Sequence, residues 1–324
     1  MRAITVDRWM EPAELRVTEV TEPKAGPGAL LVEVRAAGCN FFDILIVQGK
    51  YQVKPDFPFT PGGELSGVVR EVGAGVEGFA VGDRVLAGTQ IGGFAELAVV
   101  PARGTQQLPD GMSFEEGAAL PIVYPTSYAA LIFRADLQAG ETLLVHAASG
   151  GVGSAAVQIG KALGARVIAT VGGAEKVKIA RELGADEVID YREDDFVNRV
   201  KELTDGRGAD VICDSVGGDV FDRSLKCIAW NGRLVVVGFA SGRIPEVKAN
   251  RILLKNIAVT GVHWGAYLFN EPERVPETFA GLFALYSDGR IKPLIYGRYA
   301  LEDLPSALAD LASRKTHGKL IITP

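Results

Sequence analysis

The sequence predicts an α/β protein in which a doubly wound parallel sheet is combined with a β-rich domain. Three observations lead to this prediction: a glycine turn between an apolar strand and a helix at residues 145–156, a regular alternation of strand-like and helix-like segments after that turn, and short alternating segments rich in Gly and Pro before it. With 324 residues, the chain is long enough to build two hydrophobic cores.

The glycine turn follows Val145 and reads His-Ala-Ala-Ser-Gly-Gly-Val-Gly-Ser-Ala-Ala. Gly151, Gly153 and Ala156 fit the pattern G-x-G-x-x-A, whose small residues permit a tight turn, a close approach of backbone to a pyrophosphate, and packing of helix on strand. Phosphates would lie at the helix N-terminus, where free N–H groups and the helix dipole favour negative charge. A turn without a ligand is the alternative. The residues predicted to bind the cofactor here are Ser149, Gly150, Gly151, Val152 and Gly153.

The segments around and after this turn alternate between apolar runs rich in Val and Ile and amphipathic stretches of mixed charge. The predicted strands are Thr142–Ala147, Arg166–Val171, Glu187–Asp190, Asp210–Asp214, Arg233–Val237 and Ile257–Val262. The predicted helices are Val152–Leu163, Glu175–Leu183, Asp194–Leu203 and Val220–Ala229. Helical crossovers make such a sheet parallel and place its ligand beyond the carboxyl ends of the strands. Gly217, Gly238 and Ser241 follow two of these strands and are expected at the same crevice.

The first ~120 residues read as an all-β domain of a partly closed, barrel-like kind. Its predicted strands are Arg2–Val6, Ala29–Ala37, Gly67–Val72, Arg84–Gly88 and Gly93–Val100. After the sixth strand of the sheet come a predicted helix, Val275–Asp288, and strands at Pro293–Tyr299 and Lys319–Ile322, which we expect to return and complete the first domain. The predicted division is therefore residues 1–122 for the β-rich domain, 123–262 for the doubly wound domain and 263–324 for the return.

Composition excludes several classes of protein. The net charge of −6 provides no electrostatic footprint for nucleic acid or an anionic membrane. No apolar run approaches the ~18 residues of a membrane span, and the N-terminus has no signal-peptide pattern. Cys39, Cys213 and Cys227 lack metal-type spacing, which favours a reducing, cytoplasmic setting.

Particular segments carry a family resemblance. Pro61–Val69 (Pro-Gly-Gly-Glu-Leu-Ser-Gly-Val-Val), Val81–Val85 (Val-Gly-Asp-Arg-Val) and the turn Ala148–Gly153 together resemble the medium-chain dehydrogenase/reductase superfamily, over essentially the whole chain. Within it the chain looks like the zinc-free quinone oxidoreductase, or zeta-crystallin-like, branch. Asn250–Asn256 and Gly261–Gly265 are similar to its quinone-oxidoreductase-like group. The resemblance implies a GroES-like catalytic domain and a Rossmann domain for the dinucleotide.

The same resemblance predicts that no metal is bound. The superfamily's zinc enzymes carry zinc ligands at three places that hold Asn40, Gly63 and Ile122 here. None of these is a normal zinc ligand, because zinc is held by thiolate, imidazole or carboxylate. The three histidines are isolated in the sequence. Without a Lewis acid, hydride transfer requires acceptors that need less activation, such as quinones and α,β-unsaturated carbonyls.

The candidate catalytic residues are Asn40, Asp43, Tyr51 and Tyr124. The family pattern N-x-x-D supports Asn40 and Asp43 directly. Each tyrosine has the alternative of ordinary aromatic packing. For Asp43, as for Glu64, the alternative to acid–base work is hydrogen bonding to nearby backbone.

The cofactor prediction depends on the end of the second strand of the sheet. NAD-specific folds place an acid there, whereas this chain reads Ala-Thr-Val-Gly-Gly-Ala-Glu-Lys from Ala169 to Lys176. Lys176, Tyr191 and Arg314 match family positions near the 2′-phosphate of NADPH, so NADPH is predicted. A solvated Lys176 with Glu175 reaching the ribose is the alternative. Gly172 lies at the same strand end, and Thr126 matches a family threonine near the nicotinamide.

These features predict a zinc-independent, NADPH-dependent reductase of quinones or α,β-unsaturated carbonyls. Two alternatives stay open: an enoyl-thioester (enoyl-CoA) reductase, and an NADPH-binding structural or regulatory crystallin-like protein without turnover. A homodimer or homotetramer is expected, because relatives pair the last strands of this sheet across a two-fold axis and Asn256–Gly261 provides such an edge.

Overall fold

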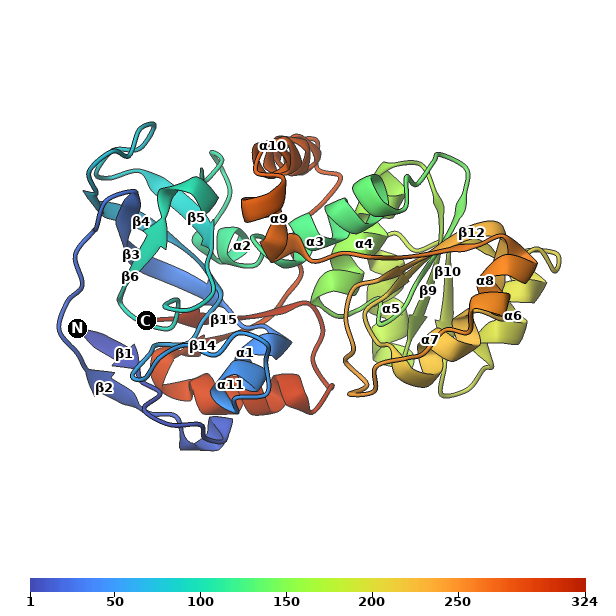
Figure 1. Cartoon of the computed structure of the whole chain (residues 1–324), viewed down its shortest axis with the longest axis horizontal. Coiled ribbons are helices and arrows are strands. Elements are labelled where there is room, and N and C mark those ends of the chain that lie inside the picture. The colour runs from blue at the N-terminus through green and yellow to red at the C-terminus, as the bar shows by residue number, and fades with distance from the viewer. The chain divides into compact units, whose positions relative to one another are not determined.

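The structure is a computed structural model that describes residues 1–324. The chain divides into two compact units (Figure 1): unit 1 is Met1–Ile122 with Pro293–Pro324, and unit 2 is Val123–Lys292. The first division coincides with the predicted one at 122/123. No helix of the structure has the length and apolar character needed to cross a membrane.

Unit 2 contains a six-stranded sheet in the order β10-β9-β8-β11-β12-β13, and every neighbouring pair is parallel. This order reverses direction at β8, so the doubly wound Rossmann prediction is confirmed. The strands are β8 (Thr142–Val145), β9 (Arg166–Val171), β10 (Glu187–Asp190), β11 (Ala209–Asp214), β12 (Ile228–Val236) and β13 (Ala258–Gly261). The helices between them are α4 (Gly151–Ala162), α5 (Ala174–Glu182), α6 (Phe196–Leu203), α7 (Gly218–Ser224) and α8 (Ala249–Lys255).

One predicted helix of this unit is too long. The prediction continued it from Val220 to Ala229, but α7 ends at Ser224 and β12 begins at Ile228. Ile228 pairs with Ala209 at the start of β11, so the backbone of this short apolar segment is used by the sheet.

The return to unit 1 begins at Pro293, later than the predicted residue 263. The intervening helices α9 (Trp264–Asn270) and α10 (Arg274–Ser287) pack within unit 2, as does α3 (Val123–Tyr128). The ring of Phe133 lies 6.1 Å from that of Tyr267, and Gly281 of α10 lies against the ring of Tyr128. These aromatic contacts hold residues 263–292 to unit 2.

Unit 1 is built on a largely antiparallel sheet in the order β14-β15-β3-β4-β5-β7, with β6 paired to β3, and on a separate hairpin of β1 and β2. The return segment supplies β14 and β15, and β15 pairs with β3. The strands are β1 (Arg2–Ile4), β2 (Val17–Glu19), β3 (Ala29–Gly38), β4 (Glu64–Val72), β5 (Arg84–Gly88), β6 (Leu97–Pro101), β7 (Thr105–Gln107), β14 (Ile295–Ala300) and β15 (Lys319–Thr323). The helices are α1 (Phe41–Val47), α2 (Phe114–Ala118) and α11 (Leu304–Ala312).

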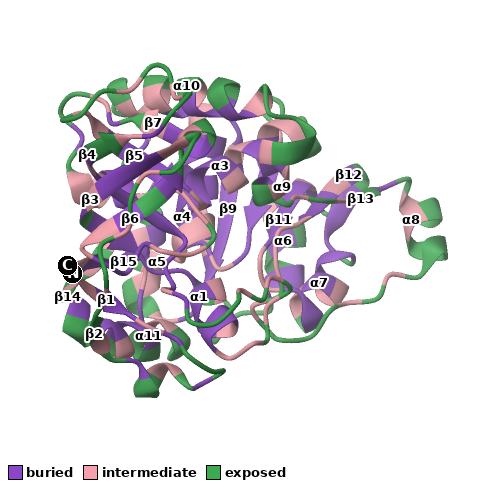
Figure 2. Cartoon of the chain, turned by 60° about the vertical axis from the view of Figure 1, so that its left-hand side comes forward, coloured by how far each residue is buried: buried purple, intermediate pink, exposed green.

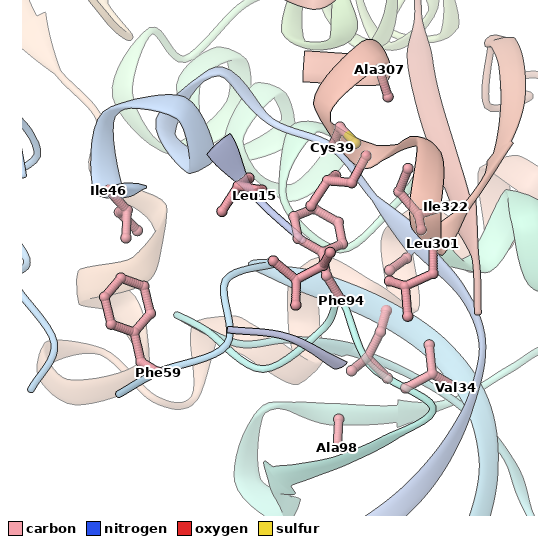
Figure 3. Packing of buried hydrophobic residues seen from close by; sticks show 14 of the residues in the cluster. Leu15, Val34, Cys39, Ile46, Phe59, Phe94, Ala98, Leu301, Ala307 and Ile322 are labelled. Atoms are coloured by element: carbon pink, nitrogen blue, oxygen red, sulfur yellow. The ribbon is translucent and has the colours of Figure 1, made fainter. Parts of the chain in front are cut away.

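The return segment also contributes to the core of unit 1. Leu301, Ala307 and Ile322 of the return belong to the same buried cluster as Phe94 and Val34 of the first part of the chain (Figure 3). Figure 2 shows buried residues concentrated on the sheet strands of both units. The final residues of the chain are thus fixed in the unit that begins with residue 1.

Candidate active site

The glycine turn connects β8 to α4 and is shaped by its own backbone. Ala147 has a φ of +51°, and its carbonyl accepts a hydrogen bond from the N–H of Gly150 at 2.9 Å. A β-carbon on Gly153 would stand 2.2 Å from that same carbonyl oxygen, so the turn itself requires glycine at this position. Helix α4 begins at Gly151 without a side-chain cap, which leaves first-turn N–H groups for an anion.

The loop after β9 gathers polar and basic groups around two glycines. The ring of Tyr191 lies on Gly172, where a β-carbon would be 2.5 Å from the Tyr191 hydroxyl. Both oxygens of Asp190 accept a hydrogen bond from the N–H of Gly173 at 3.0 Å. The guanidinium of Arg192 borders Gly173, with Nη1 3.1 Å from the place of a β-carbon.

Two cations border this loop: Lys176 in the first turn of α5, and Arg192, which follows β10 and reaches Gly173. Burial, and after it the charge of Arg192, lowers the pKa of Lys176. An anion bound beside both cations would relieve the repulsion between them. Sequence reasoning did not include Arg192 among the site residues. The only signal was its position directly after Tyr191 at the end of β10.

The loops after β11 and β12 lie together at the carboxyl ends of their strands. Asp214 Oδ1 accepts from the N–H groups of Val216 and Gly217 at 2.8 and 3.0 Å, and Ser241 N donates to Val216 O at 2.9 Å. Gly238 lies close to Ser215 O. The structure thus brings together the predicted residues Gly217, Gly238 and Ser241.

Helix α3 joins the glycine turn through Ser127, whose hydroxyl donates to Val152 O at 2.9 Å. Thr126 of the same helix is half-buried. Tyr124 is only 1% exposed, and its hydroxyl accepts from Gln158 Nε2 at 3.0 Å. The geometry of Tyr124 therefore agrees with the packing alternative.

In unit 1, a buried polar cluster contains Asn40, Asp43 and Glu64. Asp43 Oδ2 accepts from the backbone N–H of Asn40 at 2.7 Å, and Glu64 Oε2 accepts from that of Ile122 at 2.9 Å. Both carboxylates therefore accept hydrogen bonds from nearby backbone N–H groups. This agrees with the alternative to acid–base work that the sequence left open for Asp43 and Glu64. Asn40 Nδ2 also donates to Glu64 Oε1 at 2.8 Å.

Asp43 is fully buried, and burial raises the pKa of its carboxyl to about 7, against the lowering effects of the Asn40 N–H and the Lys319 charge. Its Oδ1 has no hydrogen-bond partner. A proton on this oxygen would remove the cost of an unpaired buried charge.

Lys319 completes the cluster and, like Arg192, is a residue that the sequence did not predict for the site. Its Nζ lies 2.6 Å from Glu64 Oε1 and 2.7 Å from Asn40 Oδ1, and the side chain is 4% exposed. The available signal was a single charged residue at the start of an otherwise apolar terminal strand, Lys-Leu-Ile-Ile.

The positions compared with zinc ligands do not form a metal site. A β-carbon on Gly63 would meet the ring of Phe42 at 2.2 Å and Ile122 Cδ1 at 3.3 Å, so apolar side chains fill the space of a ligand there. No group of three or more His, Cys, Asp or Glu residues could hold a metal ion. The residues present do not fit zinc.

Tyr51 and Arg314 also belong to unit 1. Tyr51 is half-buried and stacks on Phe42, with ring centroids 5.5 Å apart, and it is the most accessible of the four candidate catalytic residues. Arg314 follows α11 with a φ of +58°. Lys176 and Tyr191 belong to unit 2, so a phosphate shared with Arg314 stays a prediction.

Comparison with known proteins identifies the family. A model of zinc-binding dehydrogenases matches residues 151–285, and one of the alcohol dehydrogenase GroES-like domain matches residues 26–110. Quinone oxidoreductase-like protein 2 homolog of Nematostella vectensis is 44% identical over 324 residues, covering 99% of this chain and 88% of that protein.

Solved structures agree. The quinone oxidoreductase of Pseudomonas syringae superposes with a TM-score of 0.93 at 37% identity, over 100% of this chain and 99% of that one. The Escherichia coli quinone oxidoreductase, solved as an NADPH complex, gives 0.92 at 35% identity over 100% of both chains. The chain therefore belongs to the medium-chain dehydrogenase/reductase superfamily of oxidoreductases, in its quinone oxidoreductase-like group.

Proposed function

We propose that this protein is an NADPH-dependent oxidoreductase that reduces quinones or α,β-unsaturated carbonyls without a metal ion. The observation that carries the proposal is the combination, within unit 2, of the glycine turn at an uncapped helix with two basic side chains near the loop after β9, Lys176 of α5 and Arg192 after β10. The turn suits a pyrophosphate, and the basic pair suits a further phosphate.

The residues of unit 2 fit NADPH better than NADH. Gly172 and Gly173 directly follow β9, so no acid stands at the strand end itself, and both oxygens of Asp190 accept from the Gly173 N–H. The strand end thus lacks an acid for both ribose hydroxyls, whereas Lys176 and Arg192 are suited to a 2′-phosphate, and Glu175 at the start of α5 is the acid of the alternative with NADH. The NADPH complex of the Escherichia coli relative supports the same choice. When bound, NADPH supplies the hydride.

The residues of unit 1 determine how the acceptor is held. Reduction of a quinone or an enone adds a hydride and a proton, and charge develops on a carbonyl oxygen. The Tyr51 hydroxyl is the accessible hydrogen-bond donor among the candidates. Burial, and after it the charge of Asp43, raises the pKa of Tyr51 above its ordinary value, which keeps the phenol protonated. In this proposal Tyr51 donates to the acceptor oxygen, while Asn40 and Asp43 shape the site behind it.

Steady-state turnover tests the proposal and separates it from its alternatives. Purified protein is mixed with NADPH and, in turn, 1,4-benzoquinone, 9,10-phenanthrenequinone, a simple enone and crotonyl-CoA. We expect NADPH oxidation with quinones or enones. Turnover with crotonyl-CoA alone would favour the enoyl-thioester reductase. Thermal stabilisation by NADPH with no consumption for any acceptor would favour a binding protein.

We also propose a homodimer formed through unit 2. Strand β13 is an unpaired sheet edge, and α8 next to it in sequence has no buried residue (Figure 2). Leu253 and Leu254 of this helix are 77% and 69% exposed. A second copy pairing at β13 would cover such a surface. Light scattering of wild type and Leu253→Glu tests the proposal: the wild type is expected as a dimer or tetramer and the variant as a smaller species.

A further inference from the structure

Three oxygen atoms of unit 1 converge on the ammonium group of Lys319. Nζ donates to Cys39 O at 2.6 Å and to Asn40 Oδ1 at 2.7 Å, and it lies 2.6 Å from Glu64 Oε1. An ammonium group has three donors, so these contacts satisfy it fully. The side chains of Lys319 and Glu64 are 4% and 0% exposed, so the contact is shielded from bulk solvent.

The surrounding backbone is built for this contact. A β-carbon on Gly38 would stand 2.5 Å from Glu64 Oε1, so glycine is needed beside the carboxylate. Lys319 N donates to Leu294 O at 2.8 Å, and a β-carbon on Gly318 would stand 2.2 Å from that oxygen. The cation therefore reaches the oxygens from β15, 280 residues away from Cys39 in sequence.

The arrangement determines the orientation of the Asn40 carboxamide. Its Oδ1 accepts from Lys319 and its Nδ2 donates to Glu64 Oε1. The reversed carboxamide would direct its N–H groups at the ammonium and its oxygen at the carboxylate. A buried ion pair adds little stability compared with apolar side chains of similar volume. Its effect here is to fix one orientation of Asn40.

We propose that Cys39 O, Asn40 Oδ1 and Glu64 Oε1 form an internal binding site for a primary ammonium group, which Lys319 occupies, and that its occupation positions Asn40 for the reduction proposed above. Lys319 is a positioning residue in this account. The claim about Asn40 rests on the proposed function, whereas the claim about the ammonium site does not.

The test removes the Lys319 ammonium group by mutation and supplies a small ammonium ion from solution. Lys319→Ala is compared with wild type and with Lys161→Ala, a matched control whose ammonium lies 2.7 Å from Asp186 Oδ1 but is 36% exposed. Melting temperature is measured with increasing methylammonium chloride, and with tetramethylammonium chloride at the same ionic strength. Tetramethylammonium carries the charge but has no N–H donor.

We expect Lys319→Ala to melt at least about 5 °C below wild type, and methylammonium to raise its melting temperature saturably while tetramethylammonium does not. For wild type and for Lys161→Ala, methylammonium and tetramethylammonium should change the melting temperature by the same amount. Equal responses of Lys319→Ala to the two salts, or a melting temperature like that of Lys161→Ala, would overturn the ammonium site.

Turnover, measured well below the melting temperature, tests the positioning of Asn40. We expect kcat of Lys319→Ala to fall about 10- to 100-fold, KM for NADPH to stay within about twofold, and methylammonium to restore part of kcat. An unchanged kcat would refute the positioning role. Failure of wild type to turn over any acceptor would refute the proposed function, and the melting experiment would still test the site.

A double variant covers the case in which Lys319→Ala does not fold. Lys319→Met with Glu64→Gln removes both charges and keeps the volumes. We expect it to fold and to be more stable than Lys319→Met alone, because Glu64 is no longer an unpaired buried charge. A double variant as unstable as Lys319→Met would contradict the account.

Discussion

The ring of Phe42 occupies the space that a side chain at Gly63 would need, since a β-carbon there would stand 2.2 Å from Phe42 Cζ. Phe42 in turn stacks on Tyr51 at 5.5 Å between ring centroids. One glycine therefore allows an aromatic pair to lie where the superfamily's zinc enzymes have a ligand.

Replacing Gly63 with His is expected to destabilise the protein rather than to create a zinc site. Overpacking of this kind costs about 1–3 kcal/mol. Chemical denaturation and elemental analysis of Gly63→His measure the two effects. Adding Phe42→Ala should recover part of the lost stability. A single variant as stable as wild type, or one that binds equimolar zinc, would show that Phe42 does not exclude the ligand.

Replacing Gly153 with Ala should weaken NADPH binding at least about tenfold, because the new methyl group would push the turn away from Ala147 O. Fluorescence titration with NADPH measures the loss. Gly150→Ala is the control, since its β-carbon would be 3.3 Å from the same oxygen. It should lose less affinity. Equal losses in the two variants would mean that the close contact at Gly153 is not what shapes the turn.

Replacing Lys176 or Arg192 with Ala should remove preference for NADPH over NADH. A charge-assisted hydrogen bond contributes about 1.5–3 kcal/mol, so each loss should weaken NADPH binding by roughly 10- to 150-fold. NADH binding should change little, because NADH lacks the 2′-phosphate. Dissociation constants of both cofactors check this, with Arg314→Ala included for the predicted contact from unit 1. Equal losses of affinity for both cofactors would show that these residues support the fold or the pyrophosphate and do not bind the 2′-phosphate.

Ionisation of Asp43 should make stability depend on pH. Its pKa is raised to about 7 by burial, against about 3.9 in an unfolded chain, so between these values the folded protein retains a proton that the unfolded chain has lost. The contribution is fully present below pH ~4 and is lost as pH rises to ~7.

Urea unfolding of wild type and Asp43→Asn at pH 5 and pH 8 measures this effect. Relative to the variant, wild type should lose about 2–3 kcal/mol over this interval. His146 has the opposite influence, since burial lowers its pKa to about 3, but it is present in both proteins and cancels. A difference independent of pH would show that Asp43 does not titrate near neutrality.

Local patterns predicted the doubly wound sheet well. β9 and β10 have the predicted bounds, because their segments rich in Val and Ile end directly before Gly172 and Tyr191. The start of β12 at Ile228 was missed because a short apolar stretch after a helix looks like its last turn. The helix α11 was not predicted either, although it packs on the core of unit 1 through Leu304 and Leu308.

The sequence predicted those parts of the candidate site whose residues lie close together in the chain, and missed those that distant segments bring together. The N-x-x-D pattern identified Asn40 and Asp43, and their contact is a capping arrangement within one helix turn. The cation for Asn40 comes from Lys319, 279 residues away, and no spacing in the sequence expresses that contact. Arg192 was missed for a similar reason, because only the pairing of β9 with β10 brings it to Gly173.

The most direct test of the central claim is NADPH oxidation with a quinone by chelator-treated protein whose zinc content has been measured. The account predicts turnover at the untreated rate, less than about 0.1 zinc per chain and a marked preference for NADPH over NADH. Equimolar zinc with turnover that the chelator abolishes, or bound NADPH that no acceptor oxidises, would contradict it.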